Sequence, residues 1–248
     1  MTEALLEVRD LTKNFGALRA SDGISFDVRE GETHAIIGPN GAGKTTLISQ
    51  LAGNLRPDAG SVRFAGADIT SFPAPKRARL GLARSFQITS VYPEFSALDN
   101  VALAVQARSG HSFRFWRPAR GDAALVDPAR KVLTEVGLEN RIHVLAANLS
   151  HGEQRQLEVA MALATEPRLL LLDEPMAGMG TDESQRMIAL LQKLKQSKTI
   201  ILVEHDMDAV FRLADRISVL VYGRVIATGA PDEIRANEEV RRAYLGED

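Results

Sequence analysis

The residues with the strongest chemical signal form one glycine-rich run: Gly38, Pro39, Asn40, Gly41, Ala42, Gly43, Lys44, Thr45 and Thr46. An apolar segment, 34–37, precedes the run and a second, 47–52, follows it, which indicates strand, turn and helix. The spacing G-x-x-x-x-G-K-[ST] predicts a loop whose backbone N–H groups and helix N-terminus surround a phosphate. Lys44 is expected to reach the outer phosphates, and Thr45 to ligate Mg²⁺. A chance glycine turn explains this pattern poorly, so the run indicates binding of a nucleoside triphosphate.

Two consecutive acids, Asp173 and Glu174, follow the aliphatic run 169–172. Open α/β sheets bind ligands beyond the carboxyl ends of their strands, so Asp173 is expected to hold Mg²⁺ beside Thr45. Glu174, one residue later, is placed to activate a water against the γ-phosphate. A loop acid after a strand is usually only solvated. The phosphate loop in the same chain favours the catalytic interpretation.

A third segment, from Leu149 to Gln154, carries a helix start. Ser150 and Glu153 have the S-x-x-E spacing of a capping box, and apolar residues follow at helical spacing from Leu157. Capping by itself explains both residues. A glycine at a helix N-terminus also makes a second anion site within the chain.

Together these segments resemble the ATP-binding-cassette (ABC) ATPases, whose signature is usually Leu-Ser-Gly-Gly-Gln. The resemblance covers about residues 5–248 and implies ATP and Mg²⁺ as ligands. It implies that Phe15 stacks on adenine and that His205 is the switch histidine. It also implies that Gln87 monitors the γ-phosphate, ligates Mg²⁺ and touches a membrane partner. Considered one at a time, Phe15, Gln87 and His205 would be interpreted as ordinary core or surface residues. The signature residues that would contact ATP of a second subunit are Ser150, His151, Gly152 and Glu153.

The sequence departs from the general family pattern at two places. The signature contains His151 and Glu153 where glycine and glutamine are usual, and Gly180 replaces an aspartate that normally communicates across subunits. With the segments 154–158 and 244–247, these departures resemble the ATPases of branched-chain amino-acid importers. Such importers pair two ATPases of different length, and the helical region of this chain is similar to that of the longer ATPase.

Composition limits the remaining possibilities. The chain has 248 residues, 45% apolar and 25% charged, with a formal net charge of −2. The weak acidic balance argues against a general nucleic-acid binder, whose phosphate contacts need basic excess. The absence of cysteine excludes disulfides and thiolate chemistry. Acidic residues near Met1 argue against a signal peptide, and the lack of a long apolar run argues against a membrane span.

The apolar pattern predicts an α/β fold. Strands are expected at 5–8, 24–28, 34–37, 61–64, 168–173 and 199–203, with a loop at 12–16 and a hairpin turning at Tyr222 and Gly223. Helices are expected at 99–105, 129–136 and 182–195. The prediction is one domain, 1–248: a P-loop NTPase core of mostly parallel sheet with helices on both faces, an antiparallel β layer, and a helical subdomain inserted at about 88–160.

The basic segment 108–120 contains Phe113, Phe115 and Trp116 among arginines. We interpret it as an exposed loop whose aromatics pack onto a helix. Contact with anionic lipid headgroups and stacking with nucleic-acid bases are the less favoured alternatives.

The function expected from the resemblance is ATP hydrolysis that powers branched-chain amino-acid import. The partners expected are transmembrane permease subunits, a second ATPase in a head-to-tail homo- or heterodimer, and indirectly a substrate-binding protein, with no nucleic acid. The expected location is the cytoplasmic face of the inner membrane, as a peripheral subunit. The alternatives are urea or amide import, lipid-type export, a soluble ABC ATPase outside transport, and a nucleotide-binding regulator. One cassette without sustained heptads disfavours the soluble class, and Glu174 and His205 disfavour the regulator.

Overall fold

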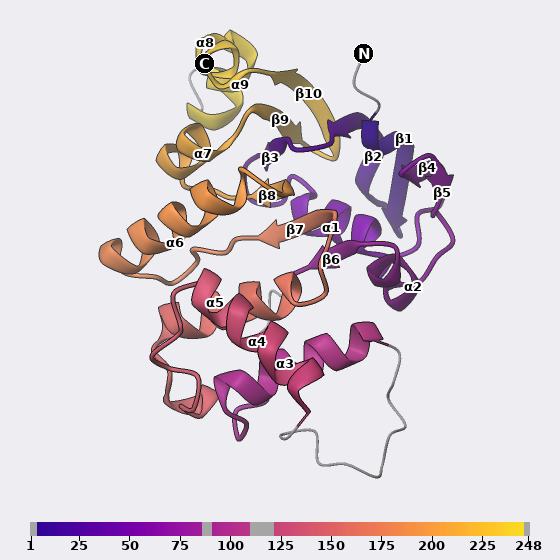
Figure 1. The fold of residues 1–248 in the computed structure, drawn as a ribbon. Coiled ribbons are helices and arrows are strands. Elements are labelled where there is room, and N and C mark those ends of the chain that lie inside the picture. The colour runs from indigo at the N-terminus through magenta and orange to yellow at the C-terminus, as the bar shows by residue number, and fades with distance from the viewer. Residues whose placement is uncertain (1–3, 86–90, 110–121, 246–248) are drawn as a thin grey trace.

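The computed structural model describes residues 4–85, 91–109 and 122–245 (Figure 1). Its centre is a six-stranded sheet in the order β10-β9-β3-β8-β7-β6. The pairs that β3 makes with β8 and β9, and that β7 makes with β6 and β8, are parallel, and β10 closes the edge antiparallel to β9. The strands span Thr33–Ile37 (β3), Leu82–Arg84 (β6), Leu169–Asp173 (β7), Thr199–Val203 (β8), Arg216–Val221 (β9) and Arg224–Gly229 (β10).

An antiparallel sheet, in the order β2-β1-β4-β5, lies beside this central sheet (Figure 1). Its strands are Ala4–Phe15 (β1), Leu18–Arg29 (β2), Ala59–Phe64 (β4) and Ala67–Asp68 (β5). Helix α1, Lys44–Ala52, follows the phosphate loop. Its buried side chains Leu47, Ile48 and Leu51 belong to the apolar cluster that joins the two sheets. The start of α1 is therefore fixed by packing on both sides.

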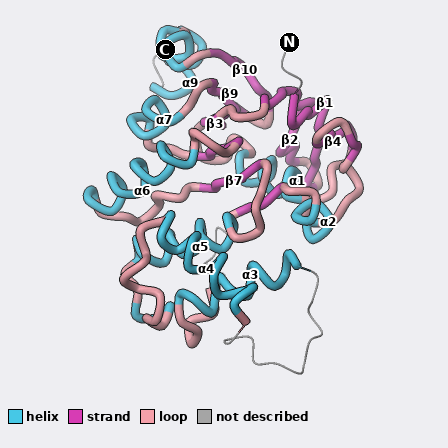
Figure 2. Tube along the Cα trace, viewed as in Figure 1, coloured by secondary structure: helices cyan, strands magenta, loops and turns pink. Residues whose placement is uncertain are grey.

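Figure 2 shows the remaining helices on the outside of the central sheet. Helices α3, α4 and α5 lie together beyond the edge strand β6, and α7 to α9 lie near β9 and β10 (Figure 1). Apolar clusters on these two sides, separate from the cluster around α1, hold them in place. The helices span Ala74–Arg79 (α2), Ala97–Ser109 (α3), Ala123–Glu135 (α4), His151–Leu163 (α5), Thr181–Leu194 (α6), Met207–Leu213 (α7), Pro231–Ala236 (α8) and Glu238–Leu245 (α9), with a 3₁₀ turn at Ala146–Asn148.

The structure confirms the α/β fold with its antiparallel layer, and the predicted hairpin turns at Tyr222 and Gly223. Three local boundaries differ from the predicted ones. Helix α4 begins at Ala123 rather than at 129, because the Asp122 side chain caps it by accepting from the Ala124 backbone N–H (3.0 Å). The segment 12–15 is strand rather than loop, because it pairs with β2 as far as Phe15 and Leu18. Helix α3 begins at Ala97 rather than Asp99, because the Ser96 hydroxyl accepts from the Asp99 backbone N–H (3.1 Å) and donates to its carboxylate (2.8 Å).

Candidate functional site

The phosphate loop turns between β3 and α1 with its lysine folded back over it. Lys44 Nζ donates to the carbonyls of Gly38 (2.6 Å) and Pro39 (3.1 Å). Burial lowers the pKa of Lys44, while the carboxylates of Glu174 and Asp173 oppose this shift. Gly43 has φ 103°, and a Cβ on it would lie 2.3 Å from the Ala20 carbonyl oxygen, so this position requires glycine. The loop therefore presents one ammonium group close to two carboxylates.

Asp173 lies at the carboxyl end of β7, where it is paired with an arginine from the neighbouring strand. Arg84 Nη2, at the end of β6, lies 2.9 Å from Asp173 Oδ2. Burial raises the pKa of Asp173, and the adjacent Arg84 charge counteracts part of that shift. Arg84 is a residue that sequence reasoning missed. The parallel pairing of β6 with β7 brings it beside Asp173, and no local motif marks it.

Glu174 has a left-handed backbone conformation, with φ 49°. Non-glycine residues rarely adopt this region, and such positions concentrate at functional sites. Its backbone N–H donates to the Val203 carbonyl (2.9 Å), which ties the end of β7 to the end of β8. The Glu174 side chain lines a hollow whose wall also contains the phosphate loop.

That hollow has a volume of about 500 Å³ and brings together most of the residues predicted to bind nucleotide. Phe15, 49% exposed, lies on its wall together with Arg19, Glu174 and Tyr222. The loop side is formed by Asn40, Gly41, Ala42, Gly43, Lys44, Thr45 and Thr46. Tyr222 is a second residue that sequence reasoning missed. The β9–β10 hairpin positions it, because Gly223 N–H donates to the Ala42 carbonyl (2.9 Å). The hollow has an aromatic wall at one part and anion-binding groups at another.

The signature residues do not share this hollow. Ser150, Gly152 and Glu153 line a separate one of about 140 Å³, and His151 lies beside it at the start of α5. The predicted capping box is present, since Glu153 N–H donates to Ser150 Oγ (3.2 Å) and Ser150 N–H donates to Glu153 Oε2 (2.9 Å). His151 Nε2 also contacts the Ala177 carbonyl oxygen at 3.0 Å. The signature helix and the phosphate loop thus line two separate hollows of the chain.

His205 lies just after β8 with its side chain 65% exposed. The preceding residue, Glu204, is buried and connects two loops. Its carboxylate accepts from the backbone N–H of Met176 (3.1 Å) and from that of His205 (3.1 Å). Burial raises the pKa of Glu204, and these backbone donors oppose the shift. Glu204 is a third residue that sequence reasoning missed.

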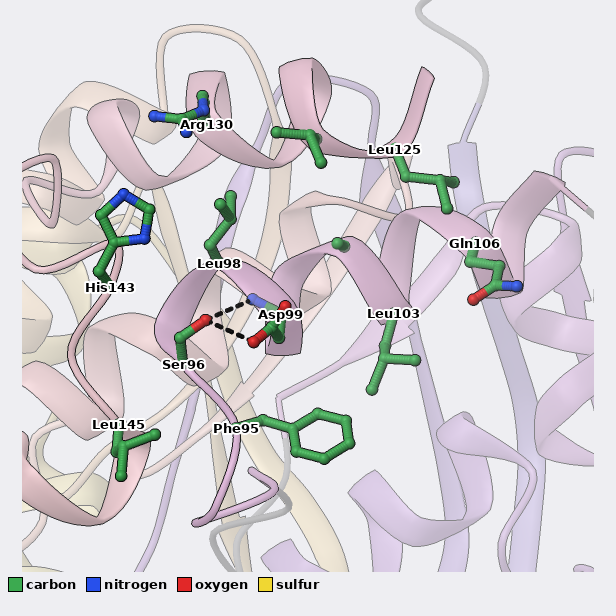
Figure 3. A pocket seen from close by; sticks show the side chains of 12 residues that line it. Phe95, Ser96, Leu98, Asp99, Leu103, Gln106, Leu125, Arg130, His143 and Leu145 are labelled. Carbon is green, nitrogen blue, oxygen red and sulfur yellow. Dashed lines mark hydrogen bonds between the residues drawn. The ribbon is translucent and has the colours of Figure 1, made fainter. Parts of the chain in front are cut away.

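Another hollow, of about 700 Å³, lies away from all of these groups. Figure 3 shows its lining side chains, with Leu98, Asp99 and Leu103 on α3, Leu125 and Arg130 on α4, and His143 at the end near Leu98. None of the residues predicted to bind nucleotide lines it.

Several expectations fall on parts of the chain that the structure does not describe. Gln87 and most of the basic segment 108–120 lie outside the described residues, as do the last residues of 244–247. Across 4–85, 91–109 and 122–245, no cluster of three His, Cys, Asp or Glu side chains forms a metal cage. Thr45 and Asp173 nevertheless suit Mg²⁺, which is usually held by one or two protein oxygens, waters and substrate phosphates. No helix in this described part is long and apolar enough to cross a membrane.

Comparison with known proteins gives consistent matches. Residues 21–177 match the family model described as ABC transporter, and residues 224–248 match the model described as branched-chain amino acid ATP-binding cassette transporter. The chain is 39% identical over 254 residues to the high-affinity branched-chain amino acid transport ATP-binding protein BraF of Pseudomonas aeruginosa. It is 36% identical over 259 residues to LivG of Escherichia coli, a protein with the same description. In both cases the match covers 100% of each chain.

Solved structures agree with these matches. An ATP-binding cassette of an ABC transporter in its ADP conformation superposes with a TM-score of 0.88 at 30% identity, covering 99% of this chain and 100% of that one. A nucleotide-free cassette superposes with a TM-score of 0.87 at 29% identity and the same coverage.

Proposed function

The chain belongs to the ABC transporter ATPases, and we propose that its hydrolysis of ATP powers the uptake of branched-chain amino acids through permease subunits. The observation that carries the import assignment is full-length identity of 36–39% to ATPases described as serving that transport. The match of residues 224–248 to the branched-chain amino acid model supports it independently of the nucleotide motifs.

Within one subunit, the 500 Å³ hollow supports the proposed roles of Phe15, the phosphate loop and Glu174, which line it, whereas the roles of Asp173, His205 and Gln87 rest on the family resemblance. Phe15 stacks on adenine, and residues 38–46 surround the phosphates. Lys44 leaves the carbonyls of its own loop for the phosphate oxygens, which are stronger acceptors for an ammonium group. Thr45 and Asp173 hold Mg²⁺, which neutralises phosphate charge when it is bound. Glu174 is the general base for the attacking water, while His205 and Gln87 act on the γ-phosphate.

We further propose that two ATPases face each other head to tail. The signature residues Ser150 and Gly152 form an anion site at the start of α5, and they line a different hollow from the phosphate loop. One chain does not need two anion sites for one phosphate group. A partner rotated by half a turn would place its signature helix over the nucleotide of the first chain. Gly180, at the start of α6, would then lie without a side chain on the loop that faces the partner.

The helices beyond β6 and the segment with Gln87 are the proposed contact with the permease. This arrangement makes the chain a peripheral subunit at the cytoplasmic face of the inner membrane. We propose residues 88–160 as a helical subdomain that moves relative to the α/β core when ATP binds, because nucleotide-driven domain closure is a common transition in such enzymes.

The decisive test is Glu174→Gln in the purified chain. Glutamine keeps the shape but cannot accept the proton, so turnover should fall about 10²- to 10⁴-fold, the usual contribution of a general base. With Mg-ATP the variant should shift from monomer to dimer on size exclusion, and with ADP it should not. The control is Glu139→Gln, an exposed acid after α4. Hydrolysis near the wild-type rate by the Glu174 variant would remove this residue from the base role.

A test of which substrate is transported requires the membrane partners. Vesicles that contain the chain with its neighbouring permease subunits and binding protein should accumulate labelled leucine in an ATP-dependent way, and the Lys44→Ala variant should not support this. Uptake of urea without uptake of leucine would replace the proposed substrate while leaving the ATPase assignment intact.

A further inference from the structure

An acidic side chain of the same subunit occupies the signature site. Glu183, in the first turn of α6, accepts through Oε1 from the Ser150 hydroxyl (3.1 Å) and from the Gly152 backbone N–H (3.2 Å). These donors belong to the start of α5, 33 and 31 residues earlier in the chain. They are the donors that the proposed head-to-tail dimer assigns to the γ-phosphate of the partner's ATP.

The fit between this carboxylate and Gly152 is close. A Cβ on Gly152 would lie 2.7 Å from both Cδ and Oε1 of Glu183, so a side chain at residue 152 would push the carboxylate out. Accepting from the Ser150 hydroxyl lowers the pKa of Glu183, and the backbone N–H groups of Gly152 and Gly180 act in the same direction. Glu183 is therefore charged at neutral pH and supplies the negative group that a helix N-terminus favours.

We propose that Glu183 is a further residue of the nucleotide site, an internal anion that the partner's γ-phosphate must displace before the dimer closes. This inference rests on the proposed head-to-tail arrangement. Its physical basis is competition, because the Ser150 O–H and the Gly152 N–H each have one hydrogen to donate. A phosphate group has more charge and more acceptor oxygens than a carboxylate, so it can win these donors.

The surroundings allow the carboxylate to leave without unfolding its helix. The Glu183 side chain is partly exposed, and α5 remains connected to the loop before α6 through His151 and the Ala177 carbonyl. Its departure should therefore be a side-chain movement that makes the signature site available. The carboxylate raises the ATP concentration that closure requires, and it keeps the lone subunit's anion site occupied.

A purely structural role for Glu183 is the alternative, because it lies in the first turn of α6 and accepts from the Gly180 N–H. The two roles predict opposite results. If Glu183 only supports the fold, removing its charge should weaken the signature site or leave it unchanged. If it competes with phosphate, removing its charge should strengthen anion binding there.

The first measurement uses the full chain with ADP saturating the phosphate loop. Inorganic phosphate is titrated while the amide NMR signal of Gly152 is followed, which reports the signature site alone. Glu183→Gln should lower the phosphate midpoint about two- to fivefold, the range expected when one charge near a helix N-terminus is removed. The control is Asp182→Asn, which removes an exposed charge from the same turn. It should shift the midpoint by less.

The second measurement places both substitutions in the Glu174→Gln background and follows dimer formation by analytical ultracentrifugation. Glu183→Gln should lower the ATP concentration at half dimerisation about two- to fivefold. ADP has no γ-phosphate to compete, so the chain should stay monomeric with ADP in both variants. Thermal melting of each variant checks that the chain remains folded.

An unchanged or raised phosphate midpoint in the Glu183→Gln chain overturns the inference, and so does an equal shift from Asp182→Asn. Dimer formation by the Glu183→Gln chain with ADP as readily as with ATP also overturns it, because competition acts only on the γ-phosphate. If the Glu174→Gln parent does not dimerise with ATP, the head-to-tail proposal fails instead. The Gly152 titration then still decides whether Glu183 blocks an anion site.

Discussion

Glu204 shows how a single residue can position two loops of the ATPase. It is 1% exposed, and its carboxylate accepts from Met176 N–H in the loop after Glu174 and from His205 N–H. Replacing it with alanine removes the acceptor of both N–H groups. The buried Met176 N–H is then left unsatisfied at a cost of about 1–3 kcal/mol, and the part-buried His205 N–H at a smaller one. We expect Glu204→Ala to lower kcat about 10- to 100-fold with little change in KM. The two loops that Glu204 holds carry Glu174 and His205, the residues proposed to act in the chemical step, whereas the phosphate loop, which binds ATP, is untouched.

The values of kcat and KM are measured by steady-state kinetics at a temperature below the melting transition of the variant. Glu204→Gln keeps the size and one acceptor oxygen, so it should retain more activity than the alanine variant. A lower melting temperature with unchanged kcat would show that Glu204 supports only the fold.

At the scale of elements, Arg77 joins α2 to the end of the phosphate-binding helix α1. Its guanidinium is 1% exposed and donates to the carbonyls of Gln50 and Leu51 (both 2.8 Å) and to those of Phe72 (2.9 Å) and Thr70 (3.0 Å). Burial lowers the pKa of Arg77 to about 10, so it remains charged at neutral pH, beside the negative end of α1.

We therefore expect Arg77→Met to lower the free energy of unfolding by about 2–4 kcal/mol, since it leaves buried carbonyls unpaired. Urea unfolding of the two proteins measures the difference. The matched control is Arg79→Met on the exposed side of the same helix, which should change stability by less than about 0.5 kcal/mol. Equal effects of both substitutions would contradict the role of Arg77.

At the scale of the whole molecule, a partly buried polar network connects the two sheets. Glu32 Oε1 lies 3.0 Å from His34 Nδ1 in β3 and 2.9 Å from Arg216 Nε in β9, and Arg216 also pairs with Asp27 of β2. Burial works to raise the pKa of Glu32. The hydrogen bonds from His34 and the Arg29 backbone, with the Arg216 charge, outweigh it and leave the pKa lowered.

A lowered pKa means that the ionised form of Glu32 stabilises the folded state. This contribution is present above the unfolded value of 4.5 and is lost as the pH falls through the folded pKa. We expect Glu32→Gln to reduce the free energy of unfolding by about 1–3 kcal/mol at pH 7, and by progressively less below about pH 4.5.

Urea unfolding of both proteins across this pH range tests the prediction. Glu30→Gln is the control, because its pair with Arg168 is exposed and should contribute about 0–1 kcal/mol. A difference between the Glu32 variant and the wild type that does not change between pH 7 and pH 4 would contradict it.

The sequence alone determined the features that depend on neighbouring residues. The phosphate loop, the Ser150–Glu153 capping box and the Tyr222–Gly223 hairpin each form within a few positions, so residue type and spacing predict them. The aliphatic runs before Asp173 and Glu204 predicted strands for the same reason, and the structure shows both as buried parallel strands.

Only the tertiary structure decided which distant groups meet. Arg84 reaches Asp173 across 89 residues because β6 and β7 are parallel neighbours, and Glu183 reaches Ser150 across 33 because α6 begins beside the start of α5. The same is true of Arg77 at the end of α1, 26 residues from Leu51. Strand order and helix packing arise from burial of apolar surface over the whole chain, which local patterns do not encode. Local helix and strand patterns therefore predicted the positions of the candidate site residues, and tertiary packing determined which distant side chains pair with them and shift their pKa values.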